Sequence, residues 1–250
     1  MPVIRWLAVE NRPVHSIVVE YPTVESTTMP VFRFGWALSL ALAGVAAALS
    51  GAAPSRAADP KAGAVLAVEC RDCHGVAGIS PESTVPNIAG QKEDYLALQL
   101  LRFRQAFFSQ FGDPATYMAP SSPPRSNVVM DHRAGIGNPD IQNLAAYYAG
   151  LSCRRSRPTT SVAMPGSVAF CARCHGDDGV SATRDVPNLA GQKENYLVLQ
   201  IGAFRQSNVA GPAPFDFPKR THPVMSEVAE HLTNGEIRAL AAWYANRLCH

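Results

Sequence analysis

The sequence has few charged residues and no pattern typical of β-strands. Asp, Glu, Lys and Arg make up 17% of its 250 residues, against about 25% in an average globular protein. The net charge is +2 with neutral histidines, so the strongly basic balance typical of nucleic-acid-binding proteins is absent. No stretch of useful length alternates apolar and polar residues, which argues against a half-buried β-sheet. The informative residues are cysteines.

Two copies of the run Cys-x-x-Cys-His carry the strongest chemical signal. They are Cys70–His74 and Cys171–His175, 101 positions apart. Two thiols three positions apart project to one side of a helical turn, where both can add to the vinyl groups of a haem. The adjacent histidine is then presented to the iron. A zinc ribbon would need two C-x-x-C pairs about 15 to 20 residues apart, and a thioredoxin-like pair would need a βαβ context.

We therefore predict two covalently bound haem c groups. The predicted attachment residues are Cys70, Cys73, Cys171 and Cys174, and the predicted iron-binding histidines are His74 and His175.

An internal repeat surrounds the two motifs. Residues 86–105 and 187–206 are identical at 14 of 20 positions. Further on, Ile141 matches Ile237 at an offset of 96, so the first unit has extra residues between Gln105 and Ile141. Solenoid repeats span about 20–50 residues, so this longer period indicates a duplicated domain. We place the first domain at 58–153, a linker at 154–161 and the second domain at 162–250.

Each unit is predicted to contain three helices. The first runs into the Cys-x-x-Cys-His motif, the second follows a Gly-Gln-Lys sequence, and the third closes the unit. The first helix is expected at Lys61–Cys70 in the first unit and from near Pro165 in the second. The second helix is expected at Glu93–Phe107 and at Glu194–Gln206. The third helix should begin at Asn138, as an N-cap before Pro139, and at a capping box formed by Thr233–Glu236. Long loops at 109–127 and 208–219 separate them. The predicted fold class is all-α.

The N-terminal region has the layout of a secretory signal peptide. Arg33 precedes an apolar run from Phe34 to Ala53, and small residues precede a cleavage point after Ala57. We assign 29–57 to the signal peptide and 1–28 to a non-functional extension or a misassigned start. An uncleaved membrane anchor is the alternative, because a run of about 20 residues is just long enough to span a bilayer.

These features resemble class I cytochromes c and, in tandem, the dihaem cytochrome c4 family. The resemblance rests on Cys-x-x-Cys-His-Gly, a Pro-Asn-x-Ala-Gly-Gln loop and a late methionine in each unit. It covers residues 59–250. It implies two tandem domains related by a pseudo-twofold axis, with haem propionates near the interface. It also implies a periplasmic electron carrier without enzymatic activity.

The resemblance also implies the remaining haem contacts. A proline carbonyl would hold the second ring nitrogen of each haem histidine, and Pro86 and Pro187 occupy that position. The distal ligand would be a methionine shortly before the last helix. Met225 is the single candidate in the second unit. In the first unit Met118 and Met130 compete, and the repeat register favours Met130. His132 and His222 are rivals, but they do not occupy equivalent positions.

Several questions stay open at this point. Cys153 and Cys249 end their units in matching places, and they could form one disulfide, two free thiols or an intermolecular bridge. Tyr95 and Tyr196 are candidates to reach haem edges or propionates. Lys92 and Lys193, or Arg104 and Arg205, are candidates to pair with propionates, and solvated surface charge is the alternative.

The expected partners are redox proteins: a terminal oxidase, a bc1-type complex or a dehydrogenase. We expect no nucleic-acid partner, and peripheral association with the outer face of the inner membrane is an option. One alternative function is the electron-accepting subunit of a dehydrogenase, such as a flavocytochrome c sulfide dehydrogenase. A dihaem peroxidase is another.

Overall fold

A computed structural model describes residues 57–111, 125–153, 161–208 and 220–249. The chain divides into units 1–55 and 56–250, and every described residue lies in the second. The described ranges are helical and contain no strand. They include no helix that is both long and apolar enough to cross a bilayer. The predicted extension, the apolar run, Met118 and nearly all of the predicted linker lie outside these ranges.

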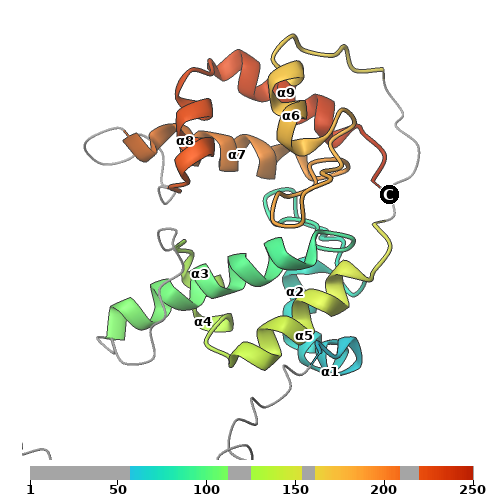
Figure 1. The fold of residues 1–250 in the computed structure, drawn as a ribbon, viewed down its shortest axis with the longest axis vertical. Coiled ribbons are helices and arrows are strands. Elements are labelled where there is room, and N and C mark those ends of the chain that lie inside the picture. The colour runs from blue at the N-terminus through green and yellow to red at the C-terminus, as the bar shows by residue number, and fades with distance from the viewer. Residues whose placement is uncertain (1–56, 112–124, 154–160, 209–219, 250) are drawn as a thin grey trace, which may run out of the picture. The chain divides into compact units, whose positions relative to one another are not determined.

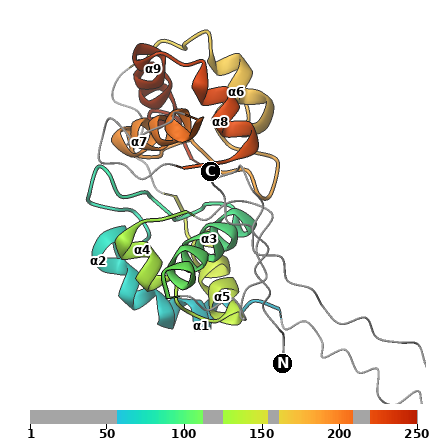
Figure 2. The same cartoon turned by 90° about the vertical axis from the view of Figure 1, so that its left-hand side faces the viewer.

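The described helices fall into two lobes that repeat one plan (Figures 1 and 2). The first lobe contains α1 (Pro60–Leu66), the 3₁₀ turn η2 (Ala67–Cys70), α2 (Arg71–His74), α3 (Glu93–Phe111), α4 (Val128–Arg133) and α5 (Asn138–Ala149). The second contains α6 (Val168–His175), α7 (Glu194–Arg205), the 3₁₀ turn η3 (Gln206–Asn208), α8 (Pro223–Glu230) and α9 (Asn234–Ala245). In each lobe the long middle helix packs against the short helix and the last helix that follow it.

The last helix and the Cys-x-x-Cys-His helix share a core in both lobes. Leu144 and Tyr148 of α5 pack with Ala67, and Leu240 and Tyr244 of α9 pack with Val168. All six residues are at most 5% exposed. Aromatic residues of the last helix therefore help to pack it onto the first helical segment of each lobe.

Helix starts match the sequence signals in two places and depart from them in two. The Asp59 side chain accepts a hydrogen bond from the Lys61 amide at 2.9 Å, and Thr233 forms the predicted capping box with Glu236. However, α6 begins at Val168 rather than near Pro165. The N-cap of α5 is Gly137 rather than Asn138, and the Asn138 side chain accepts a hydrogen bond from Arg104 at 2.6 Å.

The short helices α4 and α8 were not predicted. Each has fewer than nine residues, too few to establish a helical period in the sequence. Their side-chain caps stabilise them. Asn127 Oδ1 accepts from the Met130 amide at 3.1 Å, and His222 Nδ1 accepts from the Met225 amide at 3.3 Å.

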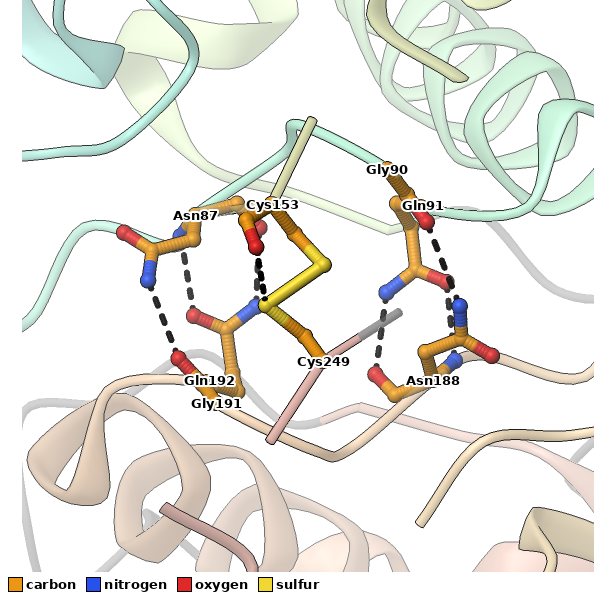
Figure 3. Close-up of a disulfide and its surroundings, with 8 residues drawn as sticks. All are labelled: Asn87, Gly90, Gln91, Cys153, Asn188, Gly191, Gln192 and Cys249. Carbon is orange, nitrogen blue, oxygen red and sulfur yellow. Dashed lines mark hydrogen bonds between the residues drawn. A yellow bond between two sulfur atoms is a disulfide. The ribbon is translucent and has the colours of Figure 1, made fainter. Parts of the chain in front are cut away.

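Equivalent loops of the two lobes bind one another through reciprocal hydrogen bonds (Figure 3). The Asn87 amide donates to Gln192 Oε1 at 2.8 Å, and the Asn188 amide donates to Gln91 Oε1 at 2.8 Å. Gln91 and Gln192 in turn donate to the carbonyls of Asn188 and Asn87 at 3.0 and 2.8 Å. Each bond thus has a symmetric counterpart, as a pseudo-twofold axis requires. We call these four residues the amide belt.

A disulfide joins Cys153 and Cys249 beside the amide belt (Figure 3). The Cα atoms of the two cysteines are 5.8 Å apart, inside the usual range for a disulfide. Each cysteine lies against a glycine of its own lobe's loop, Gly90 or Gly191. Of the three alternatives left open for this cysteine pair, the structure has the intramolecular bridge.

Candidate haem sites

The two Cys-x-x-Cys-His motifs have the same local structure. In each, the first cysteine is half-buried and the second is exposed. Cys70 packs in the core that contains Tyr148, and Cys171 in the core that contains Tyr244. Burial raises the pKa of both thiols. Each lobe therefore presents one anchored and one accessible thiol on a single helical segment.

Both motif histidines are held in the orientation that iron binding requires. His74 Nδ1 lies 2.9 Å from the carbonyl oxygen of Pro86, and His175 Nδ1 lies 2.9 Å from that of Pro187. Both imidazoles are only 7% exposed. Burial lowers the pKa of each, which favours neutral rings. A neutral ring that donates from Nδ1 has a free lone pair on Nε2 for a metal.

A glycine follows each histidine because no side chain fits there. Gly75 has φ +76° and Gly176 has φ +81°. A Cβ atom at either position would overlap a backbone carbonyl oxygen, that of Ile79 or Val180. A serine side chain stabilises the turn in each lobe. Ser80 Oγ donates to the Cys73 carbonyl, and Ser181 Oγ donates to the Cys174 carbonyl, both at 2.7 Å.

The two predicted distal methionines occupy equivalent places in the fold. Met130 lies in α4 and Met225 in α8, each half-buried and each at the third position after its N-cap. Their roles as iron ligands stay predictions.

The rival histidines are engaged differently from each other. The His222 Nδ1 atom caps α8. His132 is exposed and packs edge-on against Phe107.

A group of buried arginines lies between the middle helices of the two lobes. Arg125 donates to Tyr196 and Gln200 of the other lobe at 3.0 and 2.9 Å. Arg220 donates reciprocally to Tyr95 and Gln99 at 3.1 and 3.0 Å. Arg102 belongs to the same group, but the other repeat has no arginine at the equivalent position. We call Arg102, Arg125 and Arg220 the interlobe arginine cluster.

The interlobe arginine cluster has no carboxylate partner among the described residues. The ion pairs of the described ranges are Arg133–Glu69 and Arg184–Asp94, both elsewhere. The Nε atoms of Arg102 and Arg220 are buried without a hydrogen-bond partner. Burial opposes ionisation of Tyr95, yet the positive charges of Arg220 and Arg125 lower its pKa. Uncompensated buried cations are costly, so an anion such as a haem propionate would stabilise the cluster.

The residues present therefore fit two haems. Thiols, oriented histidines and methionines occur in equivalent sets, and the buried cations between the lobes match carboxylate groups. Tyr95 and Tyr196 contact the arginine cluster, which supports their predicted position near propionates. Arg104 and Arg205, by contrast, donate to backbone carbonyls of their own lobes, those of Ile136 and Leu232, both at 3.0 Å.

The arginine cluster was not predicted, although the sequence carries a signal for it. Arg125 and Arg220 align at an offset of 95, which differs from both offsets used to define the repeat. An alignment that allowed gaps inside the long loops would have paired them.

Comparisons with known proteins agree with this geometry. A family model described as cytochrome c matches residues 167–246. The thiosulfate dehydrogenase electron acceptor of Thiomonas intermedia (strain K12) is 30% identical over 198 residues, covering 72% of this chain and 78% of that protein. Cytochrome c4 of Stutzerimonas stutzeri is 28% identical over 204 residues, covering 75% and 88%.

Two solved structures share the fold. Reduced recombinant cytochrome c4 from Pseudomonas stutzeri has a TM-score of 0.57 at 25% identity and covers 77% of this chain and 100% of that chain. A thiosulfate dehydrogenase from Marichromatium purpuratum has a TM-score of 0.56 at 28% identity and covers 76% of this chain but 40% of that chain. This chain therefore belongs to the dihaem cytochrome c4 family, with two tandem class I cytochrome c domains and covalently bound haem c.

Proposed function

We propose that this protein is a periplasmic dihaem carrier that takes electrons from a bc1-type complex or a dehydrogenase and passes them to a terminal oxidase. The observation that carries the proposal is the interlobe arginine cluster, in which each lobe's arginine bonds to the other lobe's tyrosine. Because both lobes contribute to these buried cations, the propionate-bearing edges of both haems would lie at the same interface. When bound, each haem supplies a one-electron centre.

The proposed roles of the chain's residues follow from this assignment. His74, Met130, His175 and Met225 would hold the two haem irons. Pro86 and Pro187 fix the histidine rings. A histidine and a methionine that both stay bound would leave little to rearrange during electron transfer, and a methionine sulfur would raise the reduction potential. A site without an open position favours a carrier over an enzyme.

The proposed location follows from the N-terminal sequence. The signal-peptide layout at 29–57 would export the chain, and domains at 58–153 and 162–250 would then form the mature protein. Peripheral attachment to the outer face of the inner membrane would leave the two lobes on the periplasmic side.

The test combines spectroscopy with partner kinetics on the purified mature holoprotein. The reduced protein is exposed to carbon monoxide, which should leave both spectra unchanged because neither iron has an open position. It is then mixed with membranes that contain a terminal oxidase, and we expect reoxidation that cyanide blocks. Carbon monoxide binding, or turnover with hydrogen peroxide, would instead indicate an enzyme with an open iron.

A second candidate function is the electron acceptor of a thiosulfate dehydrogenase. It is favoured by the 30% identity to a relative with that name and by the thiosulfate dehydrogenase chain that contains a similar fold. Thiosulfate and a purified dehydrogenase catalytic subunit would then reduce this protein rapidly. A general carrier would be reduced faster by a bc1-type complex and quinol. Co-purification with a flavoprotein would indicate a sulfide dehydrogenase subunit instead.

A further inference from the structure

The disulfide between Cys153 and Cys249 connects two lobes that fold around separate cores. Cys153 follows α5 in the first lobe, and Cys249 follows α9 in the second. Each apolar core of the described ranges belongs to one lobe, and neither cysteine is a member of any of these cores. Opening the bridge would therefore leave the packing of both lobes intact.

The remaining contacts between the lobes are polar. The amide belt and the interlobe arginine cluster consist of hydrogen bonds, and the Arg184–Asp94 ion pair is exposed. Domains that meet through polar contacts, without a large apolar interface, are expected to move relative to one another. The bridge is thus the covalent restraint on that motion within the described ranges.

The bridge also lies against the loops that orient the haem histidines. A Cβ atom on Gly90 would lie 3.0 Å from Cys153 Cβ, and one on Gly191 would lie 3.3 Å from Cys249 Sγ. The carbonyl oxygens of these two glycines accept hydrogen bonds from asparagines of the amide belt, at 3.2 and 3.1 Å. Each glycine stands four residues after the proline whose carbonyl holds its lobe's histidine. A change at the bridge would therefore reach both the interface and the haem loops.

A cavity gives access to the bridge. Its volume is about 260 Å³, and both cysteines and all four residues of the amide belt line it. The two cysteines are half-buried rather than enclosed, and Figure 3 shows the bridge among the belt's hydrogen bonds. Ligand pockets begin at roughly 300 Å³, so this space suits a small dithiol or the exposed cysteine of a dithiol protein.

We propose that the Cys153–Cys249 bridge is a modification site for dithiol reductants, and that its reduction unlatches the lobes and slows electron transfer between the two haems. The inference rests on the proposed function of a two-haem carrier. The backbone would still connect the unlatched lobes, but they would spend part of their time in arrangements that separate the haem edges.

The chemistry of the modification is thiol–disulfide exchange. A thiolate of the reductant attacks one bridge sulfur, and the other cysteine leaves as a thiolate that takes up a proton. The second thiol of the reductant then breaks the mixed disulfide and releases the remaining cysteine. Two electrons and two protons pass from the dithiol to the bridge, which leaves an oxidised reductant and two cysteine thiols.

The first measurement tests whether the bridge opens in the folded holoprotein. The haem irons are reduced beforehand with ascorbate, so that dithiothreitol added afterwards acts on the bridge alone. Iodoacetamide then labels free thiols, and mass spectrometry locates the labels. We expect labels on Cys153 and Cys249 under native conditions. Labelling that occurs only in denaturant would overturn the proposal.

The second measurement is the rate of electron exchange between the haems, taken from haem-methyl NMR signals of the half-reduced holoprotein. It compares untreated wild type, wild type with the bridge reduced and labelled, and the double variant Cys153→Ser with Cys249→Ser. We expect severalfold slower exchange in the last two samples. Dithiothreitol treatment of the double variant is the control and should change nothing, because no bridge is present.

The latch is wrong if exchange is as fast with the bridge open as with it closed, or if dithiothreitol slows the double variant as much as wild type. If the double variant does not fold, wild type that is reduced and labelled after folding gives the comparison. Haem spectra and thermal unfolding separate an unlatched protein from an unfolded one. Both measurements use no partner, so failure of the oxidase assay would refute the proposed function separately.

Discussion

At the scale of single residues, each site depends on a few backbone-defined positions. The histidine ring is oriented by a proline carbonyl twelve residues later, and the helix that presents it ends at a glycine with positive φ. These contacts have the same length in both lobes. A residue that contributes only to orientation can therefore be as constrained as a ligand.

Gly75→Ala should lower the free energy of unfolding by about 1–3 kcal/mol, the usual cost of a non-glycine residue in a strained backbone region. The added Cβ would meet the Ile79 carbonyl oxygen, so haem attachment in the first lobe should also fall. The control is Gly202→Ala in α7, where a Cβ has open space. Gly202→Ala should raise the free energy of unfolding by about 0.5–1 kcal/mol. Guanidinium unfolding of the holoprotein measures both, and equal effects of the two variants would refute the prediction.

Met130→Ala should lower the potential of the first haem because the thioether ligand is lost. A shift on the order of 100 mV is expected, part of the range of about 0.8 V over which axial ligands set haem potentials. Met118→Ala is the matched control and should change neither the spectrum nor the potential. A redox titration of each variant shows whether Met130 or Met118 is the ligand. The opposite pattern would assign the ligand to Met118.

At the scale of helices, each lobe braces its last helix against its middle helix. Arg104 donates to Asn138 at the start of α5, and Arg205 donates to Asn234 at the start of α9, both at 2.6 Å. The two last helices are nevertheless capped differently: Thr233 caps α9 with its side chain, whereas Gly137 leaves α5 without a side-chain cap.

Thr233→Ala should lower the free energy of unfolding by about 1 kcal/mol, the typical cost of losing a side-chain N-cap. The reason is that the Glu236 amide, which donates to Thr233 at 3.2 Å, would lose its partner. Thr183→Ala is the control, because Thr183 is exposed and donates to Ser181 Oγ at 3.1 Å with its backbone amide, which the substitution keeps. Chemical denaturation compares the two, and equal losses would argue against the cap.

At the scale of the whole described unit, the lobes are joined by the amide belt and by one disulfide. In the amide belt, backbone amides of each lobe donate hydrogen bonds to side chains of the other lobe. The disulfide closes a loop across a sequence separation of 96 residues. Both features act on the distance and orientation between lobes, and hence between the haems.

Cys153→Ser combined with Cys249→Ser should cost about 2–5 kcal/mol of stability, the usual effect of removing a native disulfide. The unfolded chain gains freedom when the long loop opens. Denaturation with and without a reductant measures the effect, since reductant should lower the wild type to the level of the double variant. Cys153→Ser alone controls for the serine itself and should match the double variant. No change in the double variant would show that the amide belt alone holds the lobes.

The sequence by itself determined the all-α class, the duplicated domain and the haem c cofactor. It could do so because covalent attachment requires adjacent thiols at fixed spacing, and because a duplication repeats every local signal. The sequence also indicated the middle helices, whose length makes their period readable, although the bounds of shorter elements shifted by a few residues. Helices α4 and α8 were missed since their caps, rather than a periodic pattern, stabilise them.

The tertiary structure alone decided what lies between the lobes. The Cys153–Cys249 bridge, the amide belt and the interlobe arginine cluster each join residues about 70 to 125 positions apart, and no local pattern specifies such pairs.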